Sequence, residues 1–284
     1  MKNFKKLALM GLTAVMSLSL LAACGGGNSG GAETPSGNTE TPAASGEFTT
    51  VEAGKLIMST NAQFPPYEMV GDGEGYEGTG YEGIDVEIAY AIAQKLGLEL
   101  VVDNMGFDAA LQAVQTGKSD IVMAGVTVTD DRLEVMDFSD TYANGIQVVI
   151  VPENSDIATI DDLEGKLIGC QMGTTGYIYC SDTPENGGYG EDAVIPYDDG
   201  AAAVQALMNG QVDCVVIDNA PAQEYVKANP GLKILDTEFA NENYAIGFAK
   251  GNTALKDAVN AALIELVEDG TVQSIIDKYI PAEG

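Results

Sequence analysis

Strand-like and helix-like segments alternate along most of this 284-residue chain, and this alternation limits the fold more than any other feature. Residues 55–60 predict a strand, and residues 84–96 predict a helix, because isoleucine or leucine recurs at every fourth position. Asp85, near the start of that helix, is expected to cap it. The alternation starts again after residue 145 and ends with helices within residues 254–279. This order is typical of α/β proteins, in which helices cover a sheet.

The N-terminal 24 residues have the three parts of a secretory signal. Lysines precede an apolar run that is short for a membrane span, and Leu-Ala-Ala-Cys24 ends the segment. This ending resembles a bacterial lipobox, in which the cysteine becomes the lipidated first residue of the mature protein. We therefore expect a signal peptide over residues 1–23 and a lipid on Cys24 that anchors an extracytoplasmic domain to the cell membrane. An ordinary secretory signal is the alternative.

Residues 24–47 join this anchor to the folded part of the chain. After the cysteine they contain almost no apolar bulk, so they cannot form a core and are expected to be a flexible linker. The segment from residue 48 to the C-terminus is long enough for one large domain or for two lobes of about 100 residues each. The repeated set of strands and helices favours two lobes.

The charge and the cysteine content exclude several classes of partner and site. A formal net charge of −30 excludes nucleic acid, whose phosphates require a basic surface, and excludes electrostatic adhesion to anionic lipid. The chain has no histidine and no Cys-x-x-Cys motif, so we expect no metal site. Cys170 and Cys214 lie in apolar strand-like runs and are expected to be buried thiols rather than a disulfide.

A glycine pattern at residues 73–78 matches the dinucleotide fingerprint Gly-x-Gly-x-x-Gly only by its letters. No strand precedes it at the required distance, and its acidic neighbours would repel a pyrophosphate. We interpret this segment as a loop and expect the protein to need no cofactor.

Arg132 is the only arginine of the chain, and it ends the run Ala-Gly-Val-Thr-Val-Thr-Asp-Asp-Arg at residues 124–132. A guanidinium offers a planar set of donors that fits a carboxylate and stays charged at physiological pH. The small residues Ala124 and Gly125 leave the backbone accessible, and Thr127 adds a hydroxyl. The run therefore indicates a pocket for a small carboxylate; the alternative is a surface arginine paired with a neighbouring aspartate.

This run, with Met-Asp-Phe-Ser-Asp-Thr-Tyr at residues 136–142, closely resembles the signature of the extracytoplasmic solute-binding proteins for polar amino acids, family 3, which feed ABC importers. The resemblance covers nearly all of residues 48–284. It implies a two-lobed α/β fold like that of periplasmic binding proteins, each lobe a sheet flanked by helices, joined by two hinge strands that allow a cleft to close on its ligand. The implied limits are residues 48–143 plus 242–284 for lobe 1, residues 144–241 for lobe 2, and hinge crossings near residues 143–147 and 239–243.

The resemblance also implies roles for individual residues. Arg132 and the Thr127 amide would hold a ligand carboxylate, and Asp218 would hold an ammonium group together with the Gly125 carbonyl and the Thr127 hydroxyl. For Asp218 the alternative is that it only caps the following helix. The complete ligand-binding set implied by the resemblance is Asn61, Phe64, Phe107, Ala124, Gly125, Thr127, Arg132, Gln171, Thr174, Thr175 and Asp218.

The turn at residues 173–176, with Thr174 and Thr175, follows a strand and opens a helix, so it suits an anion. The side chain of the ligand should contact residues 61–67, Phe107 and Gln171. Phe64 and Phe107 match aromatic residues that sandwich the ligand in the family, with ordinary core packing as the alternative. Asn61 stands where many relatives carry an aspartate, and Gln171 is also neutral. Both amides donate and accept hydrogen bonds, so we predict a neutral polar side chain. The nearby Glu68 leaves a basic amino acid open as the alternative.

The sequence thus predicts a lipid-anchored, monomeric receptor that binds a free L-α-amino acid and delivers it to the permease of an ABC importer. A ligand sensor that docks on a signalling receptor would have the same binding site and a different partner. A dehydratase-type enzyme on the same scaffold is the third class. It would need an acid or base beside a reactive ligand, and the sequence offers no such arrangement, so we expect no enzymatic activity.

Overall fold

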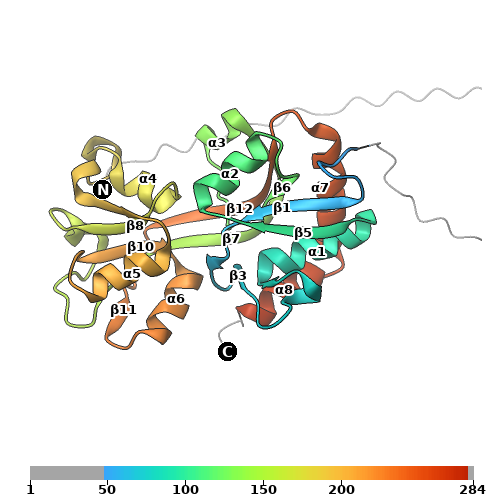
Figure 1. Cartoon of the computed structure of the whole chain (residues 1–284). Coiled ribbons are helices and arrows are strands. Elements are labelled where there is room, and N and C mark those ends of the chain that lie inside the picture. Colours follow the sequence, from blue (N-terminus) through green and yellow to red (C-terminus); the bar gives the residue numbers. More distant parts are fainter. Residues whose placement is uncertain (1–47, 281–284) are drawn as a thin grey trace, which may run out of the picture. The chain divides into compact units, whose positions relative to one another are not determined.

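The computed structural model describes residues 48–280. They form an α/β protein with two lobes, which two long strands, β7 and β12, connect (Figure 1). The signal peptide, Cys24 and the linker that the sequence predicts lie outside the described residues. Within residues 48–280, none of the helices has the length and apolar character that crossing a bilayer requires.

Lobe 1 contains parallel strands covered by helices from both ends of the described chain. Strand β1 pairs in parallel with β5 and β6, and a small antiparallel sheet of β2, β3 and β4 lies at its side. The strands are β1 (Lys55–Thr60), β2 (Gln63–Phe64), β3 (Glu68–Val70), β4 (Tyr81–Glu82), β5 (Glu99–Asn104) and β6 (Ile121–Val122). The helices are α1 (Ile84–Leu96), α2 (Phe107–Gln115), α3 (Asp130–Val135), α7 (Thr253–Glu268) and α8 (Thr271–Tyr279).

Lobe 2 repeats the α/β arrangement within one continuous stretch of chain. Strand β8 pairs in parallel with β9 and β10. The strands are β8 (Ile168–Gln171), β9 (Val194–Tyr197), β10 (Cys214–Asp218) and β11 (Leu232–Ile234), and the helices are α4 (Thr175–Ser181), α5 (Gly200–Met208) and α6 (Asn219–Ala228).

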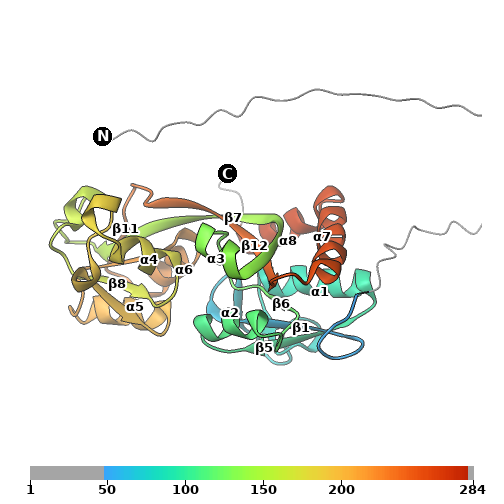
Figure 2. The same cartoon turned by 90° about the horizontal axis from the view of Figure 1, so that it is seen from above.

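Strands β7 (Met136–Pro152) and β12 (Ala240–Ala249) run antiparallel to each other between the lobes (Figure 2). They join the strands of both lobes into one nine-stranded sheet, with β12 beside β6 on one side and β7 beside β10 on the other. The sequence predicts a strand only from Gln147 onward, because polar residues such as Asp137 and Asp140 interrupt the apolar pattern of the first half of β7. These two strands are the connection at which the sequence predicts the hinge crossings.

The core of lobe 1 explains why the predicted helix at residues 84–96 forms. Ile84, Ile88 and Ile92 are fully buried on one side of α1 and share a hydrophobic core with residues of α7. Burying each such side chain contributes about 1.5–3 kcal/mol relative to leaving it exposed. The expected cap is wrong: Gly83 occupies the N-cap, whereas Asp85 is fully buried and points its carboxylate toward other elements.

Lobe 2 has its core on two sides of the sheet, and one of them contains the three cysteines. Cys170, Cys180 and Cys214 are all fully buried and unpaired. The prediction of buried thiols for Cys170 and Cys214 is confirmed. These side chains act as small apolar groups between β8, β10 and α4.

Candidate functional site

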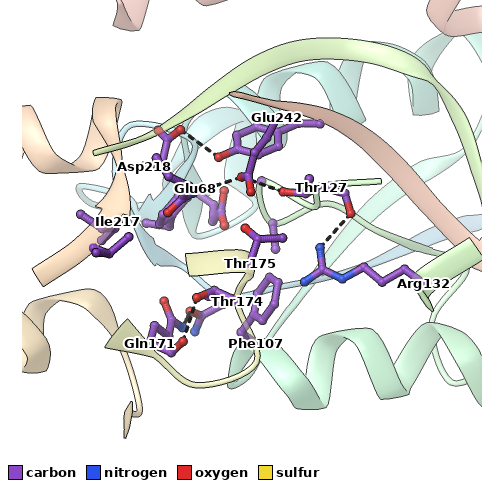
Figure 3. Close-up of a pocket in the computed structure, with 17 residues that line it drawn as sticks. Glu68, Phe107, Thr127, Arg132, Gln171, Thr174, Thr175, Ile217, Asp218 and Glu242 are labelled. Atoms are coloured by element: carbon purple, nitrogen blue, oxygen red, sulfur yellow. Dashed lines mark hydrogen bonds between the residues drawn. The ribbon is translucent and has the colours of Figure 1, made fainter. Parts of the chain in front are cut away.

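A pocket lies between the two lobes and contains about 470 Å³ of space that protein atoms leave free. Its walls come from both lobes and from the two connecting strands (Figure 3). All of the residues that the sequence predicts for the site lie in these walls. The lining residues are Asn61, Phe64, Glu68, Phe107, Ala124, Gly125, Thr127, Arg132, Gln147, Gln171, Thr174, Thr175, Val216, Ile217, Asp218, Glu242 and Tyr244. A cleft in which a few polar groups converge among apolar and aromatic side chains is typical of sites for small molecules.

Arg132 supplies the only guanidinium of the pocket and is 8% exposed. Its Nη1 donates to the Thr127 carbonyl at 2.8 Å, and its Nη2 donates to the Gly173 carbonyl of lobe 2 at 3.2 Å. The Cζ atom lies 5.5 Å from the centre of the Phe107 ring. Burial lowers the pKa of Arg132, yet a guanidinium stays protonated in proteins. The alternative of a surface arginine is therefore wrong, and the remaining N–H groups can bind a carboxylate.

Thr174 and Thr175 lie at the start of α4, in the wall that lobe 2 contributes. Thr174 is the N-cap: its Oγ1 accepts from the Tyr177 N–H at 3.3 Å and donates to the Gln171 carbonyl at 2.8 Å. Thr175 is buried at the next position. Since Arg132 bonds to the residue just before this turn, one carboxylate can contact both the guanidinium and the turn.

Asn61 and Gln171 form what we call the amide end of the pocket. Gln171 Nε2 donates to Asn61 Oδ1 at 2.9 Å, and this bond joins lobe 2 to lobe 1. Asn61 Nδ2 in turn donates to the Met105 carbonyl at 2.9 Å, and Gln171 Nε2 also approaches the Asp198 carbonyl at 3.3 Å. The polar groups of this end are thus largely satisfied by the protein itself.

Glu68, Asp218 and Glu242 form what we call the acidic end of the pocket (Figure 3). Each is at most 4% exposed. The three residues come from β3, β10 and β12, so both lobes and a connecting strand contribute. A buried carboxylate requires hydrogen bonds or an opposite charge, and these three groups differ in how many partners they have.

Asp218 is the best satisfied of the three. Its Oδ1 accepts from the Ala220 N–H at 3.0 Å, and its Oδ2 accepts from the Tyr244 hydroxyl at 2.9 Å and from the Ile146 N–H at 3.0 Å. Burial raises the pKa of Asp218 to about 6, and these hydrogen bonds oppose that rise. Asp218 both caps α6 and lines the pocket, so the two interpretations of this residue are compatible.

Glu242 has partners on one oxygen only. Its Oε2 accepts from the Thr127 hydroxyl at 2.9 Å and from Gln147 Nε2 at 3.1 Å. Its Oε1 has no hydrogen-bond partner among the described residues. Glu242 is not among the residues that the sequence predicts for the site, although a charged residue inside a predicted hinge crossing is a signal that could identify it.

Glu68 is fully buried, and neither of its carboxylate oxygens accepts a hydrogen bond from the described residues. Burial raises its pKa well above the ordinary value, and the neighbouring Asp85 adds to the shift. Asp85 lies behind the pocket wall, where it accepts from the Gly125 N–H at 3.0 Å and from the Tyr142 hydroxyl at 2.8 Å. Burial also raises the pKa of Asp85, to about 6. Two buried carboxyl groups of this kind can share one proton.

Gly125 has a shape requirement as well as this hydrogen bond. Its φ of +54° lies in the left-handed region, and a Cβ atom there would come within 2.8 Å of the Phe64 ring. That ring stacks on Tyr67 with a centroid distance of 5.6 Å, and Tyr67 packs edge-on against Tyr244 at 5.3 Å. A glycine therefore allows the aromatic wall and the loop before α3 to meet.

The charges of the pocket are unequal, since one guanidinium accompanies the three carboxyl groups of the acidic end. This arrangement suits a small molecule that carries one anionic group and at least one cationic group. No cluster of histidine, cysteine or acidic side chains suited to a metal ion occurs within residues 48–280. The lining contains no histidine or cysteine that could serve as a nucleophile or proton shuttle.

Comparison with known proteins places most of the chain in one family. The model of the family described as bacterial extracellular solute-binding proteins, family 3, matches residues 56–282. The arginine-binding extracellular protein ArtP of Bacillus subtilis is 31% identical over 283 residues, which cover 98% of this chain and 99% of that protein. The L-cystine-binding protein TcyJ of Escherichia coli is 32% identical over 235 residues, covering 82% and 85%.

Solved structures agree with these sequence matches. A structure of an ancestral arginine-binding protein bound to arginine is 39% identical, with a TM-score of 0.71, and covers 80% of this chain and 98% of that one. A structure of an ancestral arginine-binding protein bound to glutamine is 38% identical, with a TM-score of 0.70, and covers 81% of this chain and 99% of that one.

Proposed function

Because the chain belongs to the bacterial extracellular solute-binding proteins of family 3, we propose that it is the amino-acid-binding component of an ABC importer. Its ligand is a free L-α-amino acid with a cationic side chain, held in the pocket between the lobes. Relatives named for arginine and for cystine support the amino-acid class. Membership of a solute-binding family supports a non-enzymatic role.

The charge balance of the pocket is the observation that carries the choice of ligand. The carboxylate of the amino acid pairs with Arg132, and its α-ammonium pairs with Asp218, assisted by the Gly125 carbonyl and the Thr127 hydroxyl. Besides these groups, the acidic end contains Glu68, which together with the neighbouring Asp85 keeps one negative charge when the two share a proton, and no neutral side chain would neutralise that charge. A second positive group on the ligand reduces this excess of buried negative charge.

A neutral polar amino acid, which the sequence favours, remains the second candidate. The Asn61–Gln171 pair at the amide end supports it, since both groups can exchange their mutual bond for bonds to an amide or a hydroxyl. The glutamine-bound ancestral structure is consistent with such a ligand in a related pocket. The amide end is already satisfied, however, whereas the acidic end is not, and for this reason we favour the cationic side chain.

Calorimetric titration of residues 48–284 with arginine, lysine, histidine, glutamine, serine and glutamate tests the proposal. Arginine or lysine should bind with the lowest Kd, glutamine and serine more weakly, and glutamate weakest of all, because its side chain adds negative charge to the acidic end. A clear preference for glutamine or serine would instead establish the neutral polar candidate. Failure of all six to bind would contradict the amino-acid class itself.

The same proposal includes the assembly in which the protein works. A monomer with lobe 1 at residues 48–143 plus 242–284 and lobe 2 at residues 144–241 closes about the strands β7 and β12 and delivers the ligand to a permease. Co-purification with a permease whose gene lies beside this one would support transport. Capture by a signalling receptor with no transporter partner would support the sensor alternative.

We also propose that a lipid on Cys24 anchors the protein to the cell membrane. Cys24→Ser should release the protein from the membrane fraction, or leave an unprocessed precursor. Fractionation with an antibody against the folded part, and the mass of the N-terminal peptide, distinguish the two results. Unchanged membrane association with normal processing would contradict lipidation.

A further inference from the structure

Glu242 belongs to β12, one of the two strands that connect the lobes (Figures 1 and 2). It pairs with Gly145 of β7 in the register of β12. A Cβ atom at Gly145 would overlap the Tyr244 ring, so the two strands approach closely here. The Glu242 side chain therefore lies at the crossing, with hydrogen-bond partners at Thr127 on one side of it and at Gln147 on the other.

The two oxygens of Glu242 have different surroundings. Oε2 is held by the Thr127 hydroxyl, from the loop before α3, and by Gln147, from β7 beyond the crossing. Oε1 lines the pocket without a partner, on a side chain that is 4% exposed. Burial raises the pKa of Tyr179, and the charge of the Glu242 carboxylate and its capacity to accept a hydrogen bond from the Tyr179 hydroxyl add to this rise; the hydroxyl therefore lies close to Glu242, although it is not in hydrogen-bond geometry with Oε1.

Neighbouring Asp218 does not have the same capacity. It already accepts three hydrogen bonds from the protein, one on Oδ1 and two on Oδ2. An alkylammonium group carries three N–H donors that need acceptors when they are buried. Asp218, the Gly125 carbonyl and the Thr127 hydroxyl oxygen can accept from these donors, but Asp218 is the only charged acceptor among them, and Glu242 Oε1 would add a second carboxylate oxygen that has no partner among the described residues.

We propose that Glu242 Oε1 accepts a hydrogen bond from the α-ammonium group of the ligand and that Glu242 thereby makes lobe closure depend on that ligand. The inference rests on the proposed function, because it requires an α-amino acid in the pocket. With the lobes apart, water can satisfy Oε1. Closure without a ligand leaves this oxygen dry and unpaired, which is unfavourable, and closure around an ammonium replaces the water with a charged donor.

This role predicts selectivity for the α-amine whatever the side chain of the ligand. The 2-hydroxy acids and the N-acetylated amino acids lack the ammonium group and should bind poorly even when their side chain is the preferred one. A residue that recognised the side chain would instead affect cationic and neutral amino acids differently.

The test compares Glu242→Gln with Glu238→Gln, an exposed carboxylate that precedes β12 and undergoes the same change of charge. Titration with arginine and with glutamine should show a loss of at least about 30-fold in affinity for both ligands in Glu242→Gln, with their ratio unchanged. Glu238→Gln should bind as the wild type does. Small-angle scattering should show that ligand-free Glu242→Gln has a smaller radius of gyration than the ligand-free wild type, because an amide tolerates closure better than an unpaired carboxylate.

Three results would overturn the inference: unchanged affinity in folded Glu242→Gln, a loss confined to arginine, or a wild type that binds the 2-hydroxy analogue of its ligand as tightly as the amino acid. The last measurement needs no variant, so it can overturn the inference even if Glu242→Gln does not fold. Absence of any amino-acid binding by the wild type would refute the proposed function instead, which keeps the two failures distinct.

Discussion

The two ends of the pocket contain similar numbers of polar groups but differ in whether those groups are already paired. At the amide end, Asn61 and Gln171 bond to each other and to backbone carbonyls. At the acidic end, Glu68 and Glu242 keep oxygens without any partner among the described residues. Residue type alone predicts that the amides select the ligand. The hydrogen-bond partners indicate that the unpaired carboxyl groups need it more.

The difference also bears on how the lobes close. The bond between Gln171 and Asn61 crosses the cleft without a ligand, as does the bond from Tyr225 to the Gln63 carbonyl at 3.0 Å. At the acidic end, the unpartnered oxygens of Glu68 and Glu242 make no hydrogen bond across the cleft to any described residue. In the closure that we propose, the amide end gains protein–protein hydrogen bonds, whereas the acidic end would need the proposed cationic ligand for its compensation.

The largest expected effect comes from removing Arg132, the only guanidinium of the pocket. Arg132→Ala should abolish amino-acid binding at millimolar ligand while the protein stays folded, since truncating one member of a buried charge pair costs about 2–5 kcal/mol. Titration calorimetry and the circular dichroism spectrum check both parts of this prediction. Lys118→Ala, which removes an exposed cation from the same lobe, is the control. Binding by Arg132→Ala within three-fold of wild type would show that the ligand carboxylate lies elsewhere.

Glu68→Gln tests most directly whether the acidic end, rather than the amide end, selects the side chain of the ligand. If Glu68 compensates a cationic side chain, arginine should bind about 10-fold to 100-fold more weakly, because hydrogen bonds to charged groups contribute about 1.5–3 kcal/mol. Glutamine binding should change much less. The melting temperature of the ligand-free variant should rise, since a buried carboxyl group with a raised pKa is removed. Glu74→Gln, an exposed loop residue, controls for net charge. Equal losses for both ligands would assign Glu68 a structural role.

The acidic end should also make binding depend on pH. Asp85 and Asp218 have pKa values raised to about 6 in the ligand-free protein, and a bound cation would lower them. Affinity for arginine should therefore fall as the pH drops from about 6.5 to 5, by up to about ten-fold per pH unit for each carboxyl group. Titrations at several pH values measure the slope. A flat profile would show that these carboxyl groups do not interact with the ligand.

Asp85 and Asp218 also predict how the stability of the free protein depends on pH. This dependence has the opposite sign to that of the affinity for arginine. Their ordinary pKa of 3.8 applies to the unfolded chain, so the folded state binds more protons between about pH 4 and pH 7. Their contribution to the free energy of unfolding should rise as the pH falls through this range. Urea unfolding with and without arginine at pH 7.5 and pH 5 shows whether ligand and protons compete.

Much of the fold was predictable because apolar residues are regularly spaced along helices and strands of both lobes. The fourfold repeat of α1 and the apolar strand at β10 are examples, and the family signature around Arg132 identified the lining of the pocket. The first half of β7 was not predictable, since its polar residues lie where a strand crosses between lobes rather than inside a core. Asp85 was assigned to a helix cap because sequence cannot show that its carboxylate meets Gly125 from a distant segment.

The hydrogen-bond partners of the polar residues in the site could not be predicted from the sequence either. A glutamate such as Glu242 looks like a solvated strand residue until the register places it opposite Gly145, inside the pocket wall. Asn61 and Gln171 look like free hydrogen-bonding groups until the structure shows that they bond to each other. Contacts between distant segments of the chain decide which polar group is available to a ligand. The local sequence does not reveal these contacts.

The smallest expected effect comes from placing a charge at the amide end with Asn61→Asp. The new carboxylate can still accept from Gln171 Nε2, but it loses the donor that bonds the Met105 carbonyl, and this loss offsets part of any electrostatic gain. We expect arginine to gain about three-fold to five-fold over glutamine, corresponding to roughly 1 kcal/mol. Competition titrations of arginine against glutamine in wild type and variant measure the ratio. A shift larger than that produced by Glu68→Gln would reverse the comparison, because the side chain of the ligand would then lie at the amide end.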